Sequence, residues 1–235
     1  MSPPRTALIA ITSAKFPMYP EGKNTGLFIS EALHPFNVLS KAGFEIDFAS
    51  ENGEWVPDWM SEQEDYLNGD DLKQYQDVNS PFRKALAKCA KADDVDPKKY
   101  GVFFAAGGHA ALIDFPGAVK LQQIASTIYK DGGIVSAVCH GPAIIAGLDS
   151  EVIKGKKVTG FTKKGEEDLK VLSTIEDDWK RKIVADYAKD VGAEYVSPAG
   201  PWDAFIVTDG RLVTGANPQS AHKTGEGIIE AFEKL

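Results

Sequence analysis

Short apolar runs alternate with longer segments of helical periodicity over the first part of the chain. Nearly continuous apolar runs are typical of strands that are buried on both faces of a parallel sheet. The runs are TALIAIT at 6–12, FEIDFAS at 44–50, YGVFFAA at 100–106 and IVSAV at 134–138. Amphipathic helices are predicted between them, at 26–42, 81–92 and 117–130. Because strands and helices alternate, the pattern predicts right-handed crossovers and a doubly wound α/β sandwich.

The pattern changes in the second part of the chain. Two runs, 205–208 and 211–214, flank Asp209-Gly210, which is a strong signal for a β-hairpin. Asn217-Pro218 then predicts the start of the last helix, with asparagine as the N-cap and proline in the first turn. Two weaker predictions precede the hairpin: a short strand at 157–161 and a helical segment at 166–191 with a break near Ser173.

One polar segment, 52–79, has only weak periodicity. Long polar insertions between regular elements often carry function. We therefore predict that this segment is an insertion or lid on a single domain that spans residues 1–235.

Composition narrows the class of protein. The chain has 235 residues, 43% of them hydrophobic, and a net charge of −8. Such an acidic chain without a lysine or arginine cluster is unsuited to nucleic acids and anionic membranes. No apolar stretch reaches the roughly 20 residues that span a bilayer, and the first apolar run is interpreted as a strand rather than a signal peptide. The two cysteines, Cys89 and Cys139, make no disulfide framework, so we expect a reducing, cytoplasmic location.

The sequence AVCHGPA at 137–143 carries the strongest chemical signal. A predicted strand ends directly before Cys139 and Gly141-Pro142 starts a helix, so the cysteine lies on a sharp turn like that of a nucleophile elbow. Such a turn presents the side chain at the carboxyl ends of the parallel strands, where open α/β sheets bind ligands. The helix N-terminus behind it favours the thiolate. The alternative is a packed cysteine beside a bystander His140, and spacing alone does not decide between the two.

Two glutamates are candidates for the same site. Glu31 lies on the apolar stripe of 26–42, where a carboxylate is costly unless it is paired or protonated. A raised pKa would let Glu31 donate a hydrogen bond to a thiolate or relay a proton; the alternative is a side chain at the edge of the stripe that reaches solvent. Glu166 follows Gly165 and, from its position alone, is interpreted as a first-turn acid that complements a helix dipole. No spacing of cysteine, histidine and carboxylate residues predicts a metal site.

Four stretches, in this order, resemble the ThiJ/PfpI superfamily, and the match is closest to its fungal heat-shock chaperone branch of glutathione-independent glyoxalases (glyoxalase III). They are EALHPF at 31–36, AAGGHAALIDFP at 105–116, GGIVSAVCHGPA at 132–143 and GPWDAFIVTDGRLVTGANPQSA at 200–221. The resemblance runs nearly end to end. It implies a flavodoxin-like fold, that is, a mostly parallel sheet sandwiched by helices, with a β-hairpin near the C-terminus.

The resemblance also implies a role for each candidate residue. Cys139 is the nucleophile, His140 is the histidine that follows it, and Glu166 is the acid that orients this histidine. Glu31 is the acid at the sulfur. Gly108 and the His140 N–H bind the oxyanion, and His109 lines the pocket. The chain departs from the branch at Ala110-Ala111, where glycine and threonine are usual, and in the loop Trp55–Trp59. We expect both departures near the mouth of the pocket, where they would affect substrate range and rate.

The implied activity is that of a lyase of the D-lactate dehydratase type. It converts a small 2-oxoaldehyde, methylglyoxal above all, to D-lactate through a cysteine hemithioacetal, without glutathione, metal or other cofactor. The resemblance further implies a homodimer, binding of misfolded client proteins, and a cytoplasmic location with the nucleus as a second compartment. The competing interpretations are a non-enzymatic holdase or oxidative-stress sensor with an oxidisable Cys139, and a cysteine peptidase or amidohydrolase.

Overall fold

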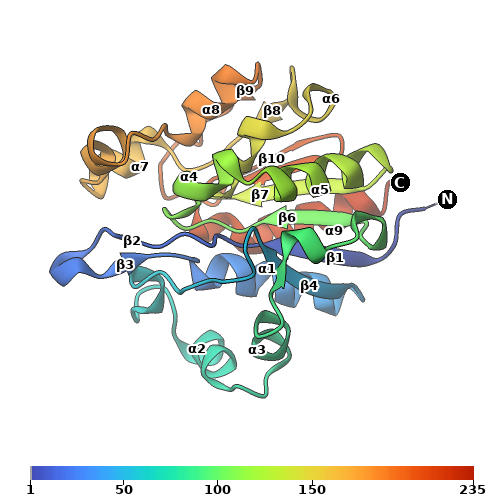
Figure 1. The fold of residues 1–235 in the computed structure, drawn as a ribbon, viewed down its shortest axis with the longest axis horizontal. Coiled ribbons are helices and arrows are strands. Elements are labelled where there is room, and N and C mark those ends of the chain that lie inside the picture. The colour runs from blue at the N-terminus through green and yellow to red at the C-terminus, as the bar shows by residue number, and fades with distance from the viewer. Residues whose placement is uncertain (1) are drawn as a thin grey trace.

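A seven-stranded sheet forms the centre of the computed structural model, which describes residues 2–235 (Figure 1). Across the sheet the strands follow the order β10-β11-β7-β6-β1-β4-β5, and every neighbouring pair is parallel except β10 and β11. The strands are β1 Thr6–Ala10, β4 Glu45–Ser50, β5 Ala90–Lys91, β6 Val102–Ala105, β7 Ile134–Val138, β10 Ile206–Asp209 and β11 Leu212–Gly215. The predicted doubly wound, mostly parallel sheet is confirmed.

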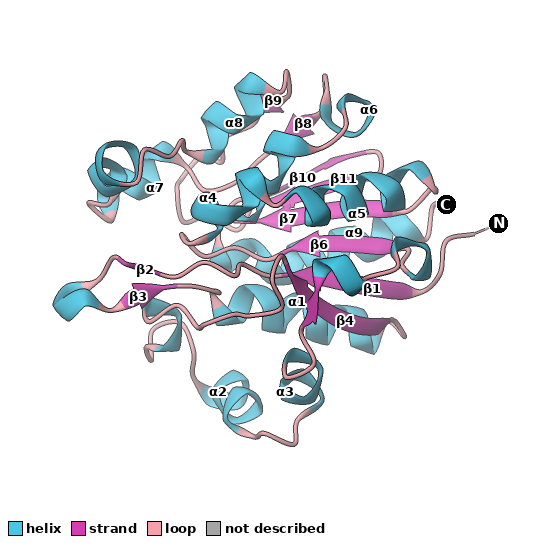
Figure 2. Ribbon diagram, in the orientation of Figure 1, coloured by secondary structure: helices cyan, strands magenta, loops and turns pink. Residues whose placement is uncertain are grey.

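Helices cover both faces of this sheet, as Figure 2 shows. Side chains alternate along the central strands: Leu8 and Phe103 belong to one apolar cluster, whereas Ile9 and Phe104 belong to the other. The first cluster is completed by α4 (Ala111–Asp114), α5 (Val119–Lys130), α6 (Ser150–Ile153) and α8 (Val184–Asp190). The second is completed by α1 (Ile29–Lys41), α3 (Pro81–Leu86) and α9 (Ala221–Phe232). Both faces are therefore buried, which explains why the strand sequences are apolar throughout instead of alternating.

The helices are shorter than their sequence patterns predict. Their bounds are α1 Ile29–Lys41, α2 Gly69–Gln76, α3 Pro81–Leu86, α4 Ala111–Asp114, α5 Val119–Lys130, α6 Ser150–Ile153, α7 Lys163–Asp168, α8 Val184–Asp190 and α9 Ala221–Phe232. The first helix begins at Ile29 and not at residue 26, because Leu27 is extended and bridges to Pro57. The segment predicted as helix 81–92 ends at Leu86, since the chain turns there to place β5 beside β4.

The region before the hairpin differs most from its prediction. The helical segment predicted at 166–191 is three pieces: α7, a short π-helical turn at Thr174–Asp178, and α8. Lys170 and Lys180 lie between these pieces with φ angles of 59° and 54°, a left-handed conformation that ends a helix. The strand predicted at 157–161 is only β8, Lys157–Val158, which pairs with β9, Glu194–Tyr195.

The C-terminal predictions are confirmed. Strands β10 and β11 form the antiparallel hairpin, with a left-handed Gly210 in its turn. The Asn217 side chain accepts a hydrogen bond from the Ser220 N–H, and Pro218 opens a short 3₁₀ turn that leads into α9. This end of the chain therefore adds two strands to the sheet, because β11 pairs with β7, the strand that precedes Cys139.

The polar segment 52–79 lies along one edge of the domain, beneath α1 in Figure 1. It contains a 3₁₀ turn at Met60–Glu62 and α2. A two-stranded flap, β2 Phe16–Pro17 and β3 Asn24–Thr25, lies next to it. Within residues 2–235, no helix combines the length and apolar character needed to cross a membrane.

Candidate active site

Cys139 follows β7 directly and occupies the sharp turn that its sequence predicts. Its φ angle is +59°, an uncommon conformation for a residue with a side chain, and the Cys139 N–H donates to the carbonyl of Gly215 over 2.9 Å. Gly141 permits the turn, since a Cβ atom there would lie 2.2 Å from the carbonyl oxygen of Ala105. The following helix is a 3₁₀ helix, Gly141–Gly147. Backbone strain of this kind is often found at a functional side chain.

The structure brings Cys139, His140 and Glu166 together in a hydrogen-bonded chain. The Cys139 sulfur lies 3.2 Å from Nδ1 of His140, and Nε2 of the same ring lies 2.8 Å from Oε1 of Glu166. Glu166 reaches the ring from α7, which Thr162 caps by accepting a hydrogen bond from the Gly165 N–H. The prediction that Glu166 only complements the helix dipole is therefore wrong, because its side chain is buried and hydrogen-bonded to His140.

The second oxygen of Glu166 contacts another histidine. Nε2 of His109 lies 2.9 Å from Oε2 of Glu166, and the His109 and His140 rings pack with their centroids 4.0 Å apart. His109 lies in the turn between β6 and α4 and is buried. Sequence reasoning placed His109 in the pocket but did not detect that it shares a carboxylate with His140.

The charge states follow from these contacts. Burial alone would raise the pKa of Glu166, but His140 and His109 outweigh it and lower the pKa to about 2. Burial and the neighbouring His109 lower the pKa of His140 to about 4, against the opposite influence of Glu166. At neutral pH the carboxylate is ionised and only accepts, so the neutral His140 ring donates its Nε2–H. Nδ1 of His140 is left with a lone pair that accepts the proton of the Cys139 thiol.

Cys139 is protonated in this environment, which corrects one prediction. The residue is only 3% exposed. Burial raises the pKa of the Cys139 thiol well above its usual range, although the His140 N–H acts in the opposite direction. The expectation that a helix N-terminus would favour the thiolate is therefore wrong for the resting state. Desolvation outweighs the backbone dipole here, and a base must remove the thiol proton as the sulfur reacts.

Glu31 is fully buried, so the alternative of an edge residue that reaches solvent is wrong. Neither of its carboxyl oxygens makes a hydrogen bond within residues 2–235. Burial raises the pKa of Glu31 well above its ordinary value; the Cys139 thiol and the Gly107 N–H lie close enough to offset part of this rise, and Asp58 adds to it. A neutral carboxylic acid beside the sulfur can donate a hydrogen bond to a thiolate or an alkoxide.

The turn Gly107-Gly108 closes tightly over the elbow. A Cβ atom at Gly107 would lie 2.5 Å from Oε2 of Glu31, so only glycine fits between this acid and the cysteine turn. Gly108 has a φ angle of +112° and approaches the carbonyl of Gly26, which a Cβ atom would reach at 2.1 Å. Gly108 lines the pocket beside Cys139 and His140, as the predicted oxyanion role requires.

The segment 52–79 supports this turn through Asp58. Asp58 is fully buried and accepts hydrogen bonds from the Tyr19 hydroxyl (2.9 Å) and the Thr25 hydroxyl (2.7 Å). Thr25 in turn accepts a hydrogen bond from the Ala110 N–H over 3.1 Å. The segment is thus tied to the turn that carries Gly108 and His109.

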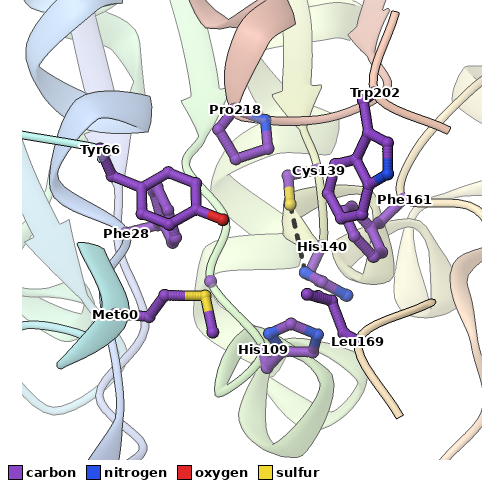
Figure 3. A pocket seen from close by; sticks show the side chains of 11 residues that line it. Phe28, Met60, Tyr66, His109, Cys139, His140, Phe161, Leu169, Trp202 and Pro218 are labelled. Carbon is purple, nitrogen blue, oxygen red and sulfur yellow. Dashed lines mark hydrogen bonds between the residues drawn. The ribbon is translucent and has the colours of Figure 1, made fainter. Parts of the chain in front are cut away.

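A small, largely apolar pocket opens onto the sulfur (Figure 3). The close-up shows His109 and His140 on one side of it, with Tyr66 and Phe28 facing them across the space. Sequence reasoning found Gly108, His109, Cys139 and His140, but missed the apolar lining, which consists of Phe28, Met60, Tyr66, Phe161, Leu169, Trp202 and Pro218. The 52–79 segment contributes Met60 and Tyr66 to this lining, whereas Trp55 and Trp59 are not among the lining residues.

The same histidines and glutamate are the set that could hold a metal ion among residues 2–235. One ligand atom from each of His109, His140 and Glu166 lies within 4.8 Å of the others. In this structure each Nε2 atom is already engaged with a Glu166 oxygen. A cation would have to displace both hydrogen bonds and take the atom through which Glu166 orients His140.

Comparison with known proteins gives a consistent result. The pattern of the DJ-1/PfpI family matches residues 27–231. The chain is 49% identical to Glyoxalase 3 of Candida albicans, with 96% of this chain and 98% of that protein aligned. It is 47% identical to the glutathione-independent glyoxalase HSP31 of Saccharomyces cerevisiae, with 98% and 99% aligned. The crystal structure of glyoxalase III from Candida albicans superposes with a TM-score of 0.94 over 98% of each chain.

Proposed function

The chain belongs to the DJ-1/PfpI family, and on this premise we propose that it is a glutathione-independent glyoxalase that converts methylglyoxal to D-lactate. The observation that carries the proposal is the hydrogen-bonded chain from Cys139 through His140 to Glu166 at the floor of a small apolar cavity. The cavity suits a small, uncharged 2-oxoaldehyde. The activity is that of a lyase of the glyoxalase III type.

The first step is addition of the Cys139 sulfur to the aldehyde carbon, C1. Because the thiol is protonated, Nδ1 of His140 takes its proton as the carbon–sulfur bond forms, and the proton ends on the former aldehyde oxygen, O1. The backbone N–H groups of Gly108 and His140 stabilise the negative charge that develops on O1. Glu31, in its neutral form, is a further donor beside the sulfur.

The second step moves hydrogen within the hemithioacetal. His140, held by Glu166, removes the proton from C1 and returns it to the neighbouring carbon, C2, by way of an enediolate. The hydroxyl proton moves from O1 to O2 in the same conversion, and the product is a thioester. Water then hydrolyses the thioester, which releases lactate and restores the thiol. The overall reaction is an internal redox isomerisation followed by thioester hydrolysis, so it needs no external oxidant or reductant.

A turnover assay with methylglyoxal in glutathione-free buffer tests this function. We expect wild-type protein to form D-lactate and Cys139→Ser to lose activity by roughly 10⁴-fold or more, the loss typical of removing the nucleophile of a triad. Cys89→Ser is the matched control, because Cys89 lies in the turn after α3, away from the cavity lining. Near-normal D-lactate production by Cys139→Ser would exclude the proposed chemistry.

The remaining features of the family pattern are also proposals: a homodimer, binding of misfolded client proteins, and a cytoplasmic or nuclear location. The oxidative-sensor role of Cys139 is a further proposal, supported by a buried thiol beside a neutral acid.

If holdase activity is independent of the site, Cys139→Ala will suppress the light scattering of a heated client protein as well as the wild type does. The peptidase alternative is disfavoured, since a peptide needs an extended groove and the sulfur lies in a small cavity.

A further inference from the structure

His109 is placed as a second acid–base group, and not simply as part of the pocket wall. Its Nε2 atom is engaged with Glu166 over 2.9 Å, and its ring packs beside that of His140. It also follows Gly108 directly in the chain, so the same turn carries the proposed oxyanion donor and this imidazole. In Figure 3 its second ring nitrogen is turned toward the side of the cavity where Met60 lies.

The hydrogen bond to Glu166 determines what this second nitrogen can do. Since an ionised carboxylate only accepts hydrogen bonds, His109 donates its Nε2–H to Glu166 in the neutral form. Nδ1 of His109 then carries a lone pair on the cavity side. A neutral imidazole in this state accepts a proton readily and can return it to another atom.

The proposed reaction needs two proton transfers after the hemithioacetal has formed. One proton moves from carbon C1 to carbon C2, and a second moves from oxygen O1 to oxygen O2. Nδ1 of His140 lies 3.2 Å from the sulfur that binds C1, so it is the group placed for the carbon-bound proton. Nδ1 of His140 is occupied with that proton while the enediolate exists, and a different group must handle the oxygens.

We propose that His109 is a catalytic residue that carries the hydroxyl proton from O1 to O2 of the bound hemithioacetal. This inference rests on the proposed glyoxalase function. Nδ1 of His109 takes the proton from O1 as the C1–O1 double bond of the thioester forms, and it gives the proton to O2, which becomes the hydroxyl of the lactyl group. Hydrogen is conserved, His109 returns to its starting state, and no co-reactant is consumed. Of the two imidazoles hydrogen-bonded to Glu166, His140 thus transfers the carbon-bound proton and His109 transfers the oxygen-bound proton.

The test separates turnover from the reactivity of the thiol. Alkylation of Cys139 by iodoacetamide reports the thiol, His140 and Glu166 without requiring substrate isomerisation. In His109→Gln we expect alkylation and KM to stay within threefold of wild type, while kcat for methylglyoxal falls by about 10². His222→Gln, an exposed histidine on α9, is the matched control and should leave kcat unchanged.

A rescue experiment distinguishes acid–base work from positioning. We expect imidazole to raise kcat of His109→Ala at least tenfold, and a series of substituted imidazoles to rescue in proportion to their basicity. If His109→Gln fails to fold, judged by its melting curve, the rescue of His109→Ala decides alone.

Three results would overturn the inference: a kcat of His109→Gln within threefold of wild type, an equal fall in its alkylation rate, or no rescue of folded His109→Ala. Each leaves the proposed function intact if the wild type still forms D-lactate, whereas a wild type without turnover refutes the function itself.

Discussion

The two walls of the cavity hold a buried glutamate in opposite ways. On the side of α7, both oxygens of Glu166 are hydrogen-bonded to histidines, and its pKa falls to about 2. On the side of α1, Glu31 makes no hydrogen bond within residues 2–235, and burial raises its pKa well above the ordinary value. The residue type and the degree of burial are the same, so the neighbours decide the charge.

This difference assigns complementary roles around one sulfur. Glu166 is a permanent acceptor, which fixes the ring nitrogen that faces Cys139 as a base. Glu31 keeps its proton and acts as a donor. Pairs of titratable groups whose environments drive their pKa values apart are a general way to obtain an acid and a base in one site. Changing each glutamate to glutamine should therefore have very different effects.

Glu166→Gln should have the larger effect. A glutamine has one acceptor oxygen and a donor amide, so it cannot accept from both His109 and His140, and at least one ring must change tautomer. We expect kcat/KM for methylglyoxal to fall by roughly 10² to 10⁴, as in other catalytic triads whose histidine is held in the wrong tautomer. The adjacent exposed Glu167→Gln is the control. Activity of Glu166→Gln within tenfold of wild type would show that the carboxylate charge is not needed.

The sequence predicts the α1 wall better than the α7 wall, for a physical reason. Burial of Glu31 follows from helical periodicity, because an acid on the apolar stripe of a helix faces the core. The elbow at Cys139 follows from an apolar strand that meets Gly141-Pro142. The contact of Glu166 with His140 has no such local signal, because it depends on how the chain after β8 returns to the sheet edge; only the family resemblance indicated it.

Other features were not predicted because they also depend on residues that are far apart in the sequence or on burial. His109 and Glu166 are 57 residues apart, and no spacing rule connects a turn after β6 with a helix after β8. The pieces between 163 and 190 are separated by lysines in a left-handed conformation, which glycine or asparagine usually signals. The raised pKa of the Cys139 thiol depends on burial of the sulfur, which is not visible in the AVCHGPA motif.

Glu31→Gln should change the pH dependence of stability more than the activity. The pKa of Glu31 is raised in the folded state, so the folded chain retains a proton that the unfolded chain releases above an ordinary value of 4.5. The wild type therefore loses stability as pH rises from that value toward the folded pKa, by about 1.4 kcal/mol per pH unit for one proton. Glutamine removes this loss.

Urea denaturation between about pH 5 and 7 measures the effect. The free energy of unfolding of Glu31→Gln, relative to wild type, should increase with pH across this range. The exposed Glu230→Gln on α9 provides the baseline and should show no such trend. A difference between Glu31→Gln and wild type that does not vary with pH would mean that Glu31 is ionised in the folded protein, and the contrast between the two walls would disappear.

The smallest effect is expected from removal of metal ions. His109, His140 and Glu166 form a set that could bind a cation, but each Nε2 atom already serves to orient an imidazole toward the thiol or the cavity. A bound metal would force both rings into the other tautomer and place a proton on Nδ1, which would remove the base from the sulfur. Dialysis against a chelator should therefore change kcat less than twofold. Loss of activity on chelation, with recovery on adding back zinc or another divalent cation, would instead make this cluster a metal centre and Glu166 a ligand rather than the acceptor that orients the two rings.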